Sequence, residues 1–538
     1  MTVPAMAGLE TEFGFAAVDR EGLRIDGKAL SKLMEATRSR VATLSGGGTR
    51  LFLENGGLLY IDAGSHLEWA TPESMSPTEI VTYARSGERL IATIVSELES
   101  TELFAEVRVW KGNVDYVQTE SSWGCHESYL YTRSGVRISE QLIPFLISRV
   151  IFTGSGGLNI ESRGIEFSLS PRVAHIKHAV SDGSMSMRGI FHTKNETLNE
   201  KNYNRLHVIC GESNCSQFQT WLKTGTMMII MAMLDAGKRP GGKLKLKQAV
   251  EAMRAIAADP ACAITFERAN GKPDTSALEI QRVYLRMAEG LLEEPFMPEW
   301  AGEICQAWRQ TLDTLARDPS LLAGKLDWVL KKQLFERQID HYPTISAEDI
   351  PVWNSVVSEL DRCLGGSLDP DFKLTSEFAL SKADKAGRVG RTIKKLTAKL
   401  DRRGLAWEQL DSFIRLRFEL CEFDVRFSEL GQRGLFESLD KAGVLDHRIV
   451  PDEECDRAMT QPPSGGRAKI RGDCIRRLAE ENRTGYLCTW TNIFGPTESL
   501  NLGDPFETEE RWHEVAGEER DPNLDLFEIP TFLRRRRE

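Results

Sequence analysis

The sequence lacks a long hydrophobic run. Its longest strongly apolar stretch, residues 227–234, is eight residues long, whereas a helix that crosses a bilayer needs about 20, so we expect no membrane contact. Residues 1–6 lack the charged and apolar regions of a secretory signal. The ten cysteines include no Cys-x-x-Cys pair, which favours reduced thiols over disulfides or zinc ligands. These absences predict a cytoplasmic protein.

Positively charged residues are also outnumbered by negatively charged ones. The chain has 68 lysines and arginines against 79 aspartates and glutamates, a net charge of −11. A general nucleic-acid-binding protein would instead carry a basic surface, so we expect no nucleic acid as a partner. The 538 residues are 41% hydrophobic and 27% charged, which excludes a disordered chain and allows a large core, divided into units of about 150 residues.

What is present is a series of strand patterns followed by a series of helix patterns. Period-2 alternation and turn residues predict strands in the first part of the chain, and helical periodicity dominates afterwards. This order favours an α+β fold over a doubly wound parallel sheet. The expected strands are residues 9–15, 58–62, 104–110, 127–132, 164–169 and 205–210, and the expected helices are residues 29–43, 77–99, 217–234, 277–292 and 321–337.

Two glutamates, Glu10 and Glu12, lie on one face of the first expected strand, because residues two apart in a strand point the same way. Hard cations such as Mg²⁺ need several oxygen ligands at one spot, and Mg²⁺ is commonly shared with substrate phosphates. Taken alone, the pair fits equally well the solvent-facing side of a strand, and both interpretations stay open at this level.

A longer series of segments gives these carboxylates a context. In their order along the chain, the segments resemble those of the Pup ligase and depupylase family, which is related to glutamine synthetase and glutamate-cysteine ligase. The resemblance covers most of residues 6–340 and resumes after about residue 404. The matching segments are Gly8-Leu9-Glu10-Thr11-Glu12-Phe13-Gly14 and residues 59–71, 123–127, 205–214, 222–226, 276–282, 327–331 and 467–472.

The resemblance implies a glutamine synthetase-like catalytic domain over residues 1–430, in which a curved antiparallel sheet packed on helices forms a cradle for ATP and Mg²⁺. It also implies a small C-terminal domain over residues 431–538, which here ends in a basic tail. By the family pattern the metal ligands would be Glu10, Glu12, Glu68 and His207, and ATP would contact Arg205, Asn113 and Trp490. Period 2 independently places Arg205 and His207 on one strand face.

Asp62 matches the catalytic aspartate of the family. In such a ligase, ATP would phosphorylate the γ-carboxylate of the modifier's C-terminal glutamate, and a lysine ε-amine of a substrate protein would then attack. An unperturbed amine with a pKa of about 10.4 is protonated at pH 7, so the reaction needs a carboxylate that orients the amine and accepts its proton. The alternative for Asp62 is a strand-end aspartate that caps a turn.

Some neighbouring positions are ambiguous or depart from the family pattern. His126 and Glu127 fall on opposite faces of an expected strand, so at most one of them points into the site. Lys194 stands where the family usually has an arginine, and lysine offers a point charge instead of a planar fork. Ser128 replaces an expected asparagine.

The family includes both ligases and depupylases built on nearly the same site. Depupylases carry an extra flexible segment before the catalytic aspartate, whereas Glu12 and Asp62 are only 50 positions apart here. This spacing and the sequence Gly64-Ser65-His66 favour the ligase. The first alternative is a depupylase or deamidase that hydrolyses the isopeptide bond or a C-terminal glutamine amide. The second is a small-molecule carboxylate-amine ligase.

An extra segment at about residues 342–403 interrupts the family pattern and is rich in positive charge. Nine basic and two acidic residues lie between positions 382 and 403, and their spacing approximates one helical face. A Pup-like modifier is expected to be small, disordered and acidic, which makes Arg391, Lys394 and Lys395 candidates for binding it. A solvated helix or linker is the alternative.

Overall fold

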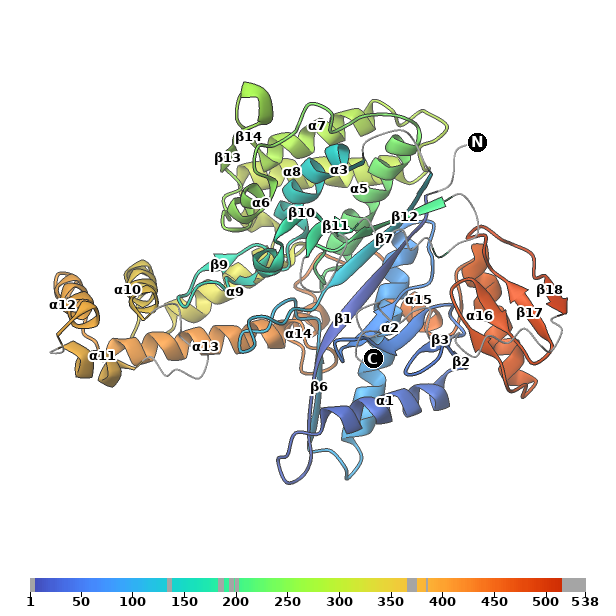
Figure 1. Ribbon diagram of the computed structural model, residues 1–538, viewed down its shortest axis with the longest axis horizontal. Coiled ribbons are helices and arrows are strands. Elements are labelled where there is room, and N and C mark those ends of the chain that lie inside the picture. The colour runs from blue at the N-terminus through green and yellow to red at the C-terminus, as the bar shows by residue number, and fades with distance from the viewer. Residues whose placement is uncertain are drawn as a thin grey trace, which may run out of the picture.

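A single large sheet runs through the protein. The computed structural model describes residues 5–132, 138–181, 188–192, 198, 203–364, 375–383 and 386–514. Fourteen strands form the sheet in the order β10-β11-β12-β7-β1-β5-β4-β3-β2-β15-β16-β17-β18, with β6 paired to β1, and helices pack against it (Figure 1). This mixed architecture confirms the expected α+β fold class.

The strands of the large sheet are mostly short. They are β1 (Ala7–Val18), β2 (Thr43–Ser45), β3 (Leu51–Leu53), β4 (Leu58–Ile61), β5 (Leu67–Ala70), β6 (Glu106–Trp110), β7 (Cys125–Thr132), β10 (His178–Ser181), β11 (Gly189–His192), β12 (Tyr203–Val208), β15 (Leu487–Cys488), β16 (Asn492–Phe494), β17 (Glu498–Asn501) and β18 (Trp512–Glu514). Two small sheets pair β8 (Gly157–Leu158) with β9 (Phe167–Ser168) and β13 (Thr265–Phe266) with β14 (Thr275–Ser276).

Helices account for most of the chain after β12. The α-helices are α1 (Asp26–Arg40), α2 (Pro77–Glu99), α3 (Ile138–Ser148), α4 (Val150–Thr153), α5 (Gln217–Asp235), α6 (Ala249–Ala257), α7 (Ala277–Glu289), α8 (Ala301–Arg317), α9 (Asp327–Asp340), α10 (Ile350–Cys363), α11 (Ser376–Ala383), α12 (Arg388–Asp401), α13 (Gln409–Phe427), α14 (Leu435–Lys441), α15 (Asp452–Arg457) and α16 (Gly466–Glu480). The 3₁₀ helices are η1 (Pro171–His175), η2 (Ala269–Gly271), η3 (Pro319–Leu322) and η4 (Ala347–Asp349).

Most expected elements are present, and two expectations are wrong. The strand expected over residues 164–169 is reduced to β9, because the Asn354 side chain occupies both backbone groups of Ile165, at 2.8 and 2.9 Å. The helix expected from residue 321 begins at Asp327, because residues 319–322 form the separate helix η3, whose N-cap is Asp318.

The long strand β1 separates a buried face from a polar face. Its residues Leu9, Thr11 and Phe13 are buried, whereas Glu10 and Glu12 are half-buried on the other face, as the period-2 pattern predicts. Helix α2 covers the apolar face. It begins at a Ser76 cap whose Oγ accepts a hydrogen bond from a backbone N–H. The sheet therefore presents its carboxylates away from the helical layer.

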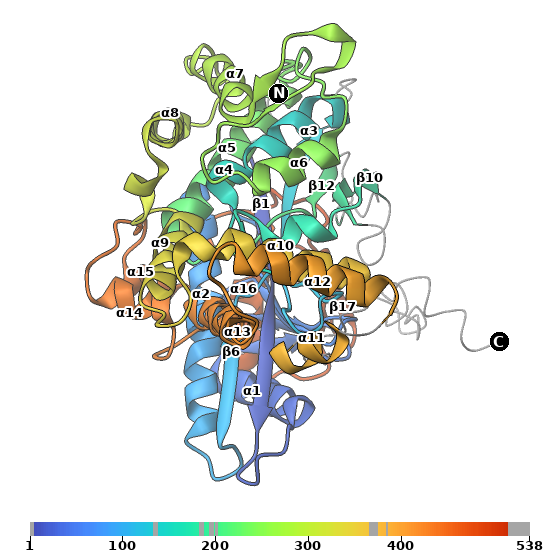
Figure 2. The same ribbon diagram turned by 90° about the vertical axis from the view of Figure 1, so that its left-hand side faces the viewer.

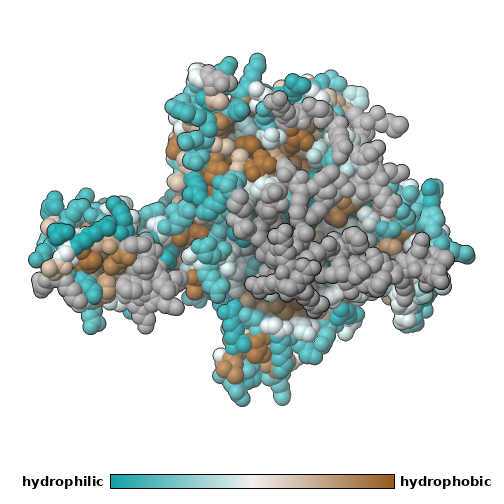
Figure 3. Space-filling model, viewed as in Figure 1, coloured by the Kyte–Doolittle hydropathy of each residue, from teal (hydrophilic) through white to brown (hydrophobic). Residues whose placement is uncertain are grey.

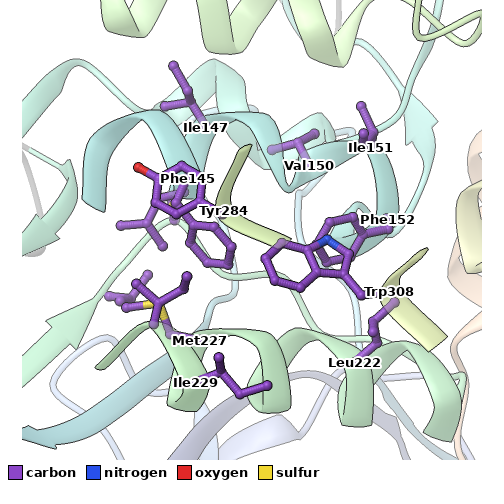
Figure 4. Packing of buried hydrophobic residues seen from close by; sticks show 14 of the residues in the cluster. Phe145, Ile147, Val150, Ile151, Phe152, Leu222, Met227, Ile229, Tyr284 and Trp308 are labelled. Atoms are coloured by element: carbon purple, nitrogen blue, oxygen red, sulfur yellow. The ribbon is translucent and has the colours of Figure 1, made fainter. Parts of the chain in front are cut away.

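The largest core lies between the sheet and helices α3, α5, α7 and α8 (Figure 4). The rings of Phe145 and Tyr284 lie edge to face with centroids 5.2 Å apart, and Trp308 contacts the Phe145 ring at 5.9 Å. Edge-to-face pairs of this kind add to the stabilisation from apolar burial. This core fixes α5 behind β7 and β12, the two strands that carry half of the site described below.

The extra segment of the sequence builds an arm that projects from the body (Figure 1). Helices α10, α11, α12 and part of α13 enclose a core of their own, in which the Trp353 and Phe413 rings stack 6.1 Å apart. Figure 2, with the arm pointing at the viewer, shows α10 and α12 side by side. The arm is therefore a packed unit and not a solvated linker.

The basic residues of the arm do not form one helical face as expected. Helix α11 ends before Gly387, whose φ of 110° is favourable only for glycine, and α12 starts after it. Lys382 thus lies on a different helix from Arg391 and Lys394, and Lys385 lies outside the described residues.

A buried polar network anchors the arm to the body. Tyr116 donates a hydrogen bond to Asp424 of α13 at 2.6 Å, and Lys331 of α9 lies 2.6 Å from the other oxygen of Asp424. Arg417, also on α13, donates to the Gly164 carbonyl at 3.1 Å. Because breaking a buried charge pair is costly, these contacts hold α13 in a fixed direction.

The C-terminal segment is built onto the same sheet. Strand β15 pairs with β2, and Arg471 of α16 donates to the Gly56 carbonyl at 2.7 Å. The boundary expected near residue 430 falls after α13, and the sheet continues across it. Within the described part of the chain, none of the helices combines the length and the hydropathy that crossing a bilayer requires.

Candidate active site

Strand pairing brings distant acidic and imidazole side chains together on the polar face of the sheet. In the register of β1 with its neighbours, Glu10 lies opposite His126 of β7, and Glu12 lies opposite Glu68 of β5. His207 of β12 joins them, because β12 pairs with β7. The predicted ligands Glu10, Glu12, Glu68 and His207 therefore share one site, although they are spread over about 200 positions of sequence.

Glu10 is the centre of the first group. Arg205 donates to Glu10 Oε1 at 2.6 Å, and the ring nitrogens of His207 and His126 lie 3.5 and 3.8 Å from Oε2. Burial alone would raise the pKa of this carboxyl, but Arg205 and the two histidines lower it well below its ordinary value. Burial and the nearby Arg205 also lower the pKa of His207 to about 4. Glu10 is thus a carboxylate and His207 a neutral imidazole at pH 7.

The second group is dominated by negative charge. Ligand atoms of Glu12, Glu68 and His126 lie within 4.8 Å of one another. Burial, Glu12 and Glu10 together raise the pKa of Glu68 well above its ordinary value. Burial and Glu68 likewise raise the pKa of the neighbouring Tyr60 phenol. Converging carboxylates disfavour one another's ionisation, and a bound cation would relieve the repulsion.

The donor set on this face fits a hard divalent cation. Carboxylate oxygens and neutral imidazole nitrogens are ligands of such ions. The buried Nε2 atom of His207 has no hydrogen-bond partner among the described residues, which is unusual for a buried polar group. Glu10, His126 and His207 form one candidate ligand group, and Glu12, Glu68 and His126 form an adjacent one.

Asp62 lies in the tight turn between β4 and β5, at one end of this row. The backbone N–H of His66 donates to Asp62 Oδ1 at 2.6 Å, and the His66 ring lies 3.5 Å from Oδ2. The turn also places Ser65 at a φ of 66°. Ligand atoms of Glu12, Asp62 and His66 lie within 4.8 Å of one another. The aspartate therefore caps its turn and at the same time lies next to the candidate ligand Glu12.

A pocket opens beside Glu10 and Arg205 at the other end of the row. Its empty volume is about 620 Å³, counting space open to solvent, which is within the roughly 300–1,000 Å³ of small-molecule sites. Trp490 from the C-terminal segment lines it together with Glu73 and Arg467. The structure thus brings the predicted ATP contacts Arg205 and Trp490 to one pocket.

Trp490 is held in place by its neighbours. The Arg471 guanidinium lies 4.7 Å from the centre of its ring, and Phe52 packs against it edge to face. Glu73 binds both Arg471 and Arg467. Burial would raise the pKa of Glu73, but these two arginines lower it to about 2. The pocket wall is therefore fixed by a charged network that the sequence did not identify.

Asn113 lies apart from this pocket. Its amide nitrogen donates to the Ser213 carbonyl at 3.3 Å, and its oxygen accepts from the Ser213 N–H at 2.8 Å. It lines a smaller pocket next to Tyr116 and Asp424. Its predicted contact with ATP stays a prediction.

The ambiguity between His126 and Glu127 is resolved by burial. His126 faces the site, and Glu127 is buried on the opposite face with the Arg149 guanidinium, whose nitrogens lie 2.9 and 2.5 Å from its oxygens. Alternation along the strand shows that the two side chains point to opposite faces, but not which of them faces the site, because both residues are polar. Ser128 lies on the site face and accepts a hydrogen bond from Arg205 at 2.9 Å; Lys194 lies outside the described residues.

The three basic residues predicted to bind the modifier are remote from these groups in the fold. Arg391, Lys394 and Lys395 all belong to α12 of the arm. All three are exposed, and Lys395 is in addition ion-paired with Glu359 of α10 at 2.6 Å.

Comparison with known proteins gives a consistent result. A family model described as Pup-ligase protein matches residues 5–350 and 392–494. A protein of Acidimicrobium ferrooxidans named "Pup--protein ligase" is 30% identical, covering 94% of this chain and 96% of its own length. Proteins of the same name from Kineococcus radiotolerans and Mycolicibacterium smegmatis are 29% and 28% identical, each covering 90% of this chain and 92% of its own length.

Two solved structures share the fold. One is the complex between the prokaryotic ubiquitin-like protein Pup and its ligase PafA, with a TM-score of 0.68 at 23% identity, covering 94% of this chain and 90% of that chain. The other is the Pup ligase PafA in complex with ADP, with a TM-score of 0.64 at 24% identity, covering 90% of this chain and 91% of that chain.

Proposed function

This chain belongs to the Pup-ligase family, and from that premise we propose that it is an ATP- and Mg²⁺-dependent ligase. It joins the C-terminal glutamate of a Pup-like protein to lysine ε-amines of substrate proteins. The observation that carries this proposal is the row of groups along the sheet. A nucleotide-sized pocket with Arg205 and Trp490 lies at one end, buried carboxylates and imidazoles lie in the middle, and Asp62 lies at the other end.

Mg²⁺ would be held by Glu10, Glu12, Glu68 and His207, with His126 as an additional ligand beside Glu10 and Glu12. When bound, it neutralises phosphate charge and lowers the repulsion that opposes attack on the γ-phosphate. Glu10 is suited to this role because Arg205 keeps it ionised. Glu68 is suited because burial, Glu12 and Glu10 disfavour its ionised form, which a bound cation would stabilise.

ATP would occupy the pocket beside Glu10, with its base against Trp490 and its phosphates toward Arg205. An aromatic face binds any base by stacking, and the Arg471 contact already fixes the ring. Arg205 is itself fixed by Glu10 and Ser128. In this placement the phosphates would lie on the side of the pocket next to the carboxylates.

The first step transfers the γ-phosphoryl group to the γ-carboxylate of the modifier's C-terminal glutamate and releases ADP. The resulting acyl phosphate has phosphate as a leaving group. Asp62 orients the incoming lysine amine and takes its proton as the C–N bond forms and the C–O bond to phosphate breaks. The short His66 N–H contact to Oδ1 fixes this carboxylate, so that Oδ2 can receive the proton.

The ligase is favoured over the depupylase by the chain between β1 and Asp62. Helix α1 and strands β2, β3 and β4 fill this stretch, and every residue of it is described. It contains no long irregular insertion of the kind expected for a depupylase. The relatives from Acidimicrobium, Kineococcus and Mycolicibacterium all carry the ligase name.

The proposal is tested by incubating the protein with ATP, Mg²⁺ and Pup that carries a C-terminal glutamate, in the presence of soluble bacterial proteins. Mass spectrometry should find isopeptide adducts on lysines with stoichiometric release of ADP. Cleavage of isopeptide or glutamine amides without net ATP turnover would instead support the hydrolase. Asp62→Asn should abolish adducts while ATP binding persists, and retained turnover would overturn the role of Asp62.

A further inference from the structure

The arm adds a surface that the site described above does not use. The family model omits residues 351–391, which contain α11 and nearly all of α10. The first turn of α12 also lies in this segment, whereas the rest of α12 lies in the matched part. The arm has a packed core of its own and a buried polar anchor on the body. Its helices are therefore fixed relative to the sheet.

The outer face of α12 carries that surface. Ile393, Leu396 and Leu400 point into the arm core, and the opposite side of the helix is basic. Arg388, Arg391 and Lys394 are exposed. We name these three residues the basic face of α12.

The described residues of the arm do not neutralise the basic face. Lys395 is paired with Glu359, and Lys399 donates to Ser355, both on α10. By contrast, no ion pair with a described carboxylate involves Arg388, Arg391 or Lys394. Figure 3 shows hydrophilic residues along the upper edge of the outer end of the arm, above a smaller hydrophobic patch. Three like charges close together on one helix repel each other, and an acidic partner would remove that repulsion.

We propose that the basic face of α12 binds an acidic segment of the protein modifier and delivers it to the sheet. This inference rests on the proposed ligase function. Charge complementarity identifies the chemistry of the partner. The modifier is favoured over the acceptor because it takes part in every turnover, whereas acceptor proteins differ in surface charge. The chain as a whole is acidic, with a net charge of −11, so an acidic modifier gains from a local basic surface.

The test compares two triple charge reversals in the full-length protein. The first is Arg388→Glu, Arg391→Glu and Lys394→Glu. The control is Lys28→Glu, Lys243→Glu and Lys245→Glu, exposed residues of the body that change the net charge equally. Lys395 is left intact because its pair with Glu359 helps to join α12 to α10.

Binding is measured by fluorescence anisotropy of labelled Pup without ATP, and turnover by adduct formation. The α12 variant should raise both Kd and KM for Pup about tenfold at low ionic strength, with kcat unchanged. The difference from the unaltered protein should disappear toward about 1 M salt. The control variant should change Kd and KM less than twofold. Circular dichroism checks the fold, and the glutamine versions of the three α12 changes should give an intermediate effect.

Equal Kd values for the two triple variants would overturn the proposal, as would an effect on the KM of the acceptor alone. A Kd shift that salt does not remove would also overturn it, since the contact would then not be electrostatic. Failure of the ligase function is distinguishable, because the unaltered protein would then form no adducts whatever its Kd for Pup.

Discussion

Glu127→Gln should destabilise the protein strongly without removing a group from the active-site face. The Glu127 carboxylate accepts two hydrogen bonds from Arg149, at 2.9 and 2.5 Å, and one from Tyr129 at 2.6 Å. Burial would raise the pKa of this carboxyl, but Arg149 and Lys223 lower it, so it is charged at pH 7. Glutamine would keep the shape and leave the buried guanidinium without a counter-charge, at a cost of about 3–5 kcal/mol.

Urea-induced unfolding followed by tryptophan fluorescence at pH 7 measures this loss. Replacing both partners, with Glu127→Leu and Arg149→Met, should recover part of it, because the guanidinium is removed with its counter-charge, while Lys223 and the Tyr129 hydroxyl still lose their interaction with Glu127. The adjacent His126→Ala is the matched comparison. It should cost no more than about 1 kcal/mol and yet reduce Mg²⁺-dependent adduct formation. Unchanged stability of Glu127→Gln, or a large loss for His126→Ala, would refute this assignment of the two faces.

Three further predictions concern the pocket and the metal site. The pKa of Glu73 is lowered to about 2 from a reference value of 4.5, so its contribution to stability is present above pH 4.5 and is lost as the pH falls toward 2. Glu73→Gln should therefore cost about 3 kcal/mol of unfolding free energy at pH 7 in urea titrations. If the stability of the variant fell between pH 4.5 and 2 as steeply as that of the unaltered protein, this prediction would be contradicted. Trp490→Ala should weaken ATP binding about tenfold by calorimetry while Trp490→Phe retains most of it, and equal affinities would exclude stacking. Glu68→Gln should raise the Mg²⁺ concentration needed for half-maximal adduct formation about tenfold or more, and an unshifted Mg²⁺ titration would remove Glu68 from the ligands.

Local patterns of residues were sufficient to predict much of the site. Period 2 placed Glu10 and Glu12 on one face of β1, and the alternation of buried residues in the strand confirms it. The Ser76 cap and the start of α2 were also predicted, because capping depends on residues three positions apart. Both patterns depend on residues close together in the sequence, and the structure contains the strand face and the helix cap that they predict.

The structure was needed wherever the competing groups were distant in sequence. Asn354 disrupts the strand expected at Ile165 from 189 positions away, and no local pattern contains that contact. The same holds for Glu73, whose role as partner of Arg467 and Arg471 spans nearly 400 positions. These charges acquire their partners only when α16 packs beside the sheet.

The sequence by itself determined the family, the α+β class and the residue types of a carboxylate-rich site, because the spacing of residues within short segments encodes them. Only the tertiary structure decided which of His126 and Glu127 faces the site and that Lys395 is already paired with Glu359. It also decided that the basic segment is a packed arm. The physical reason is that burial and charge pairing depend on strand register and helix packing, which join residues that the chain keeps far apart.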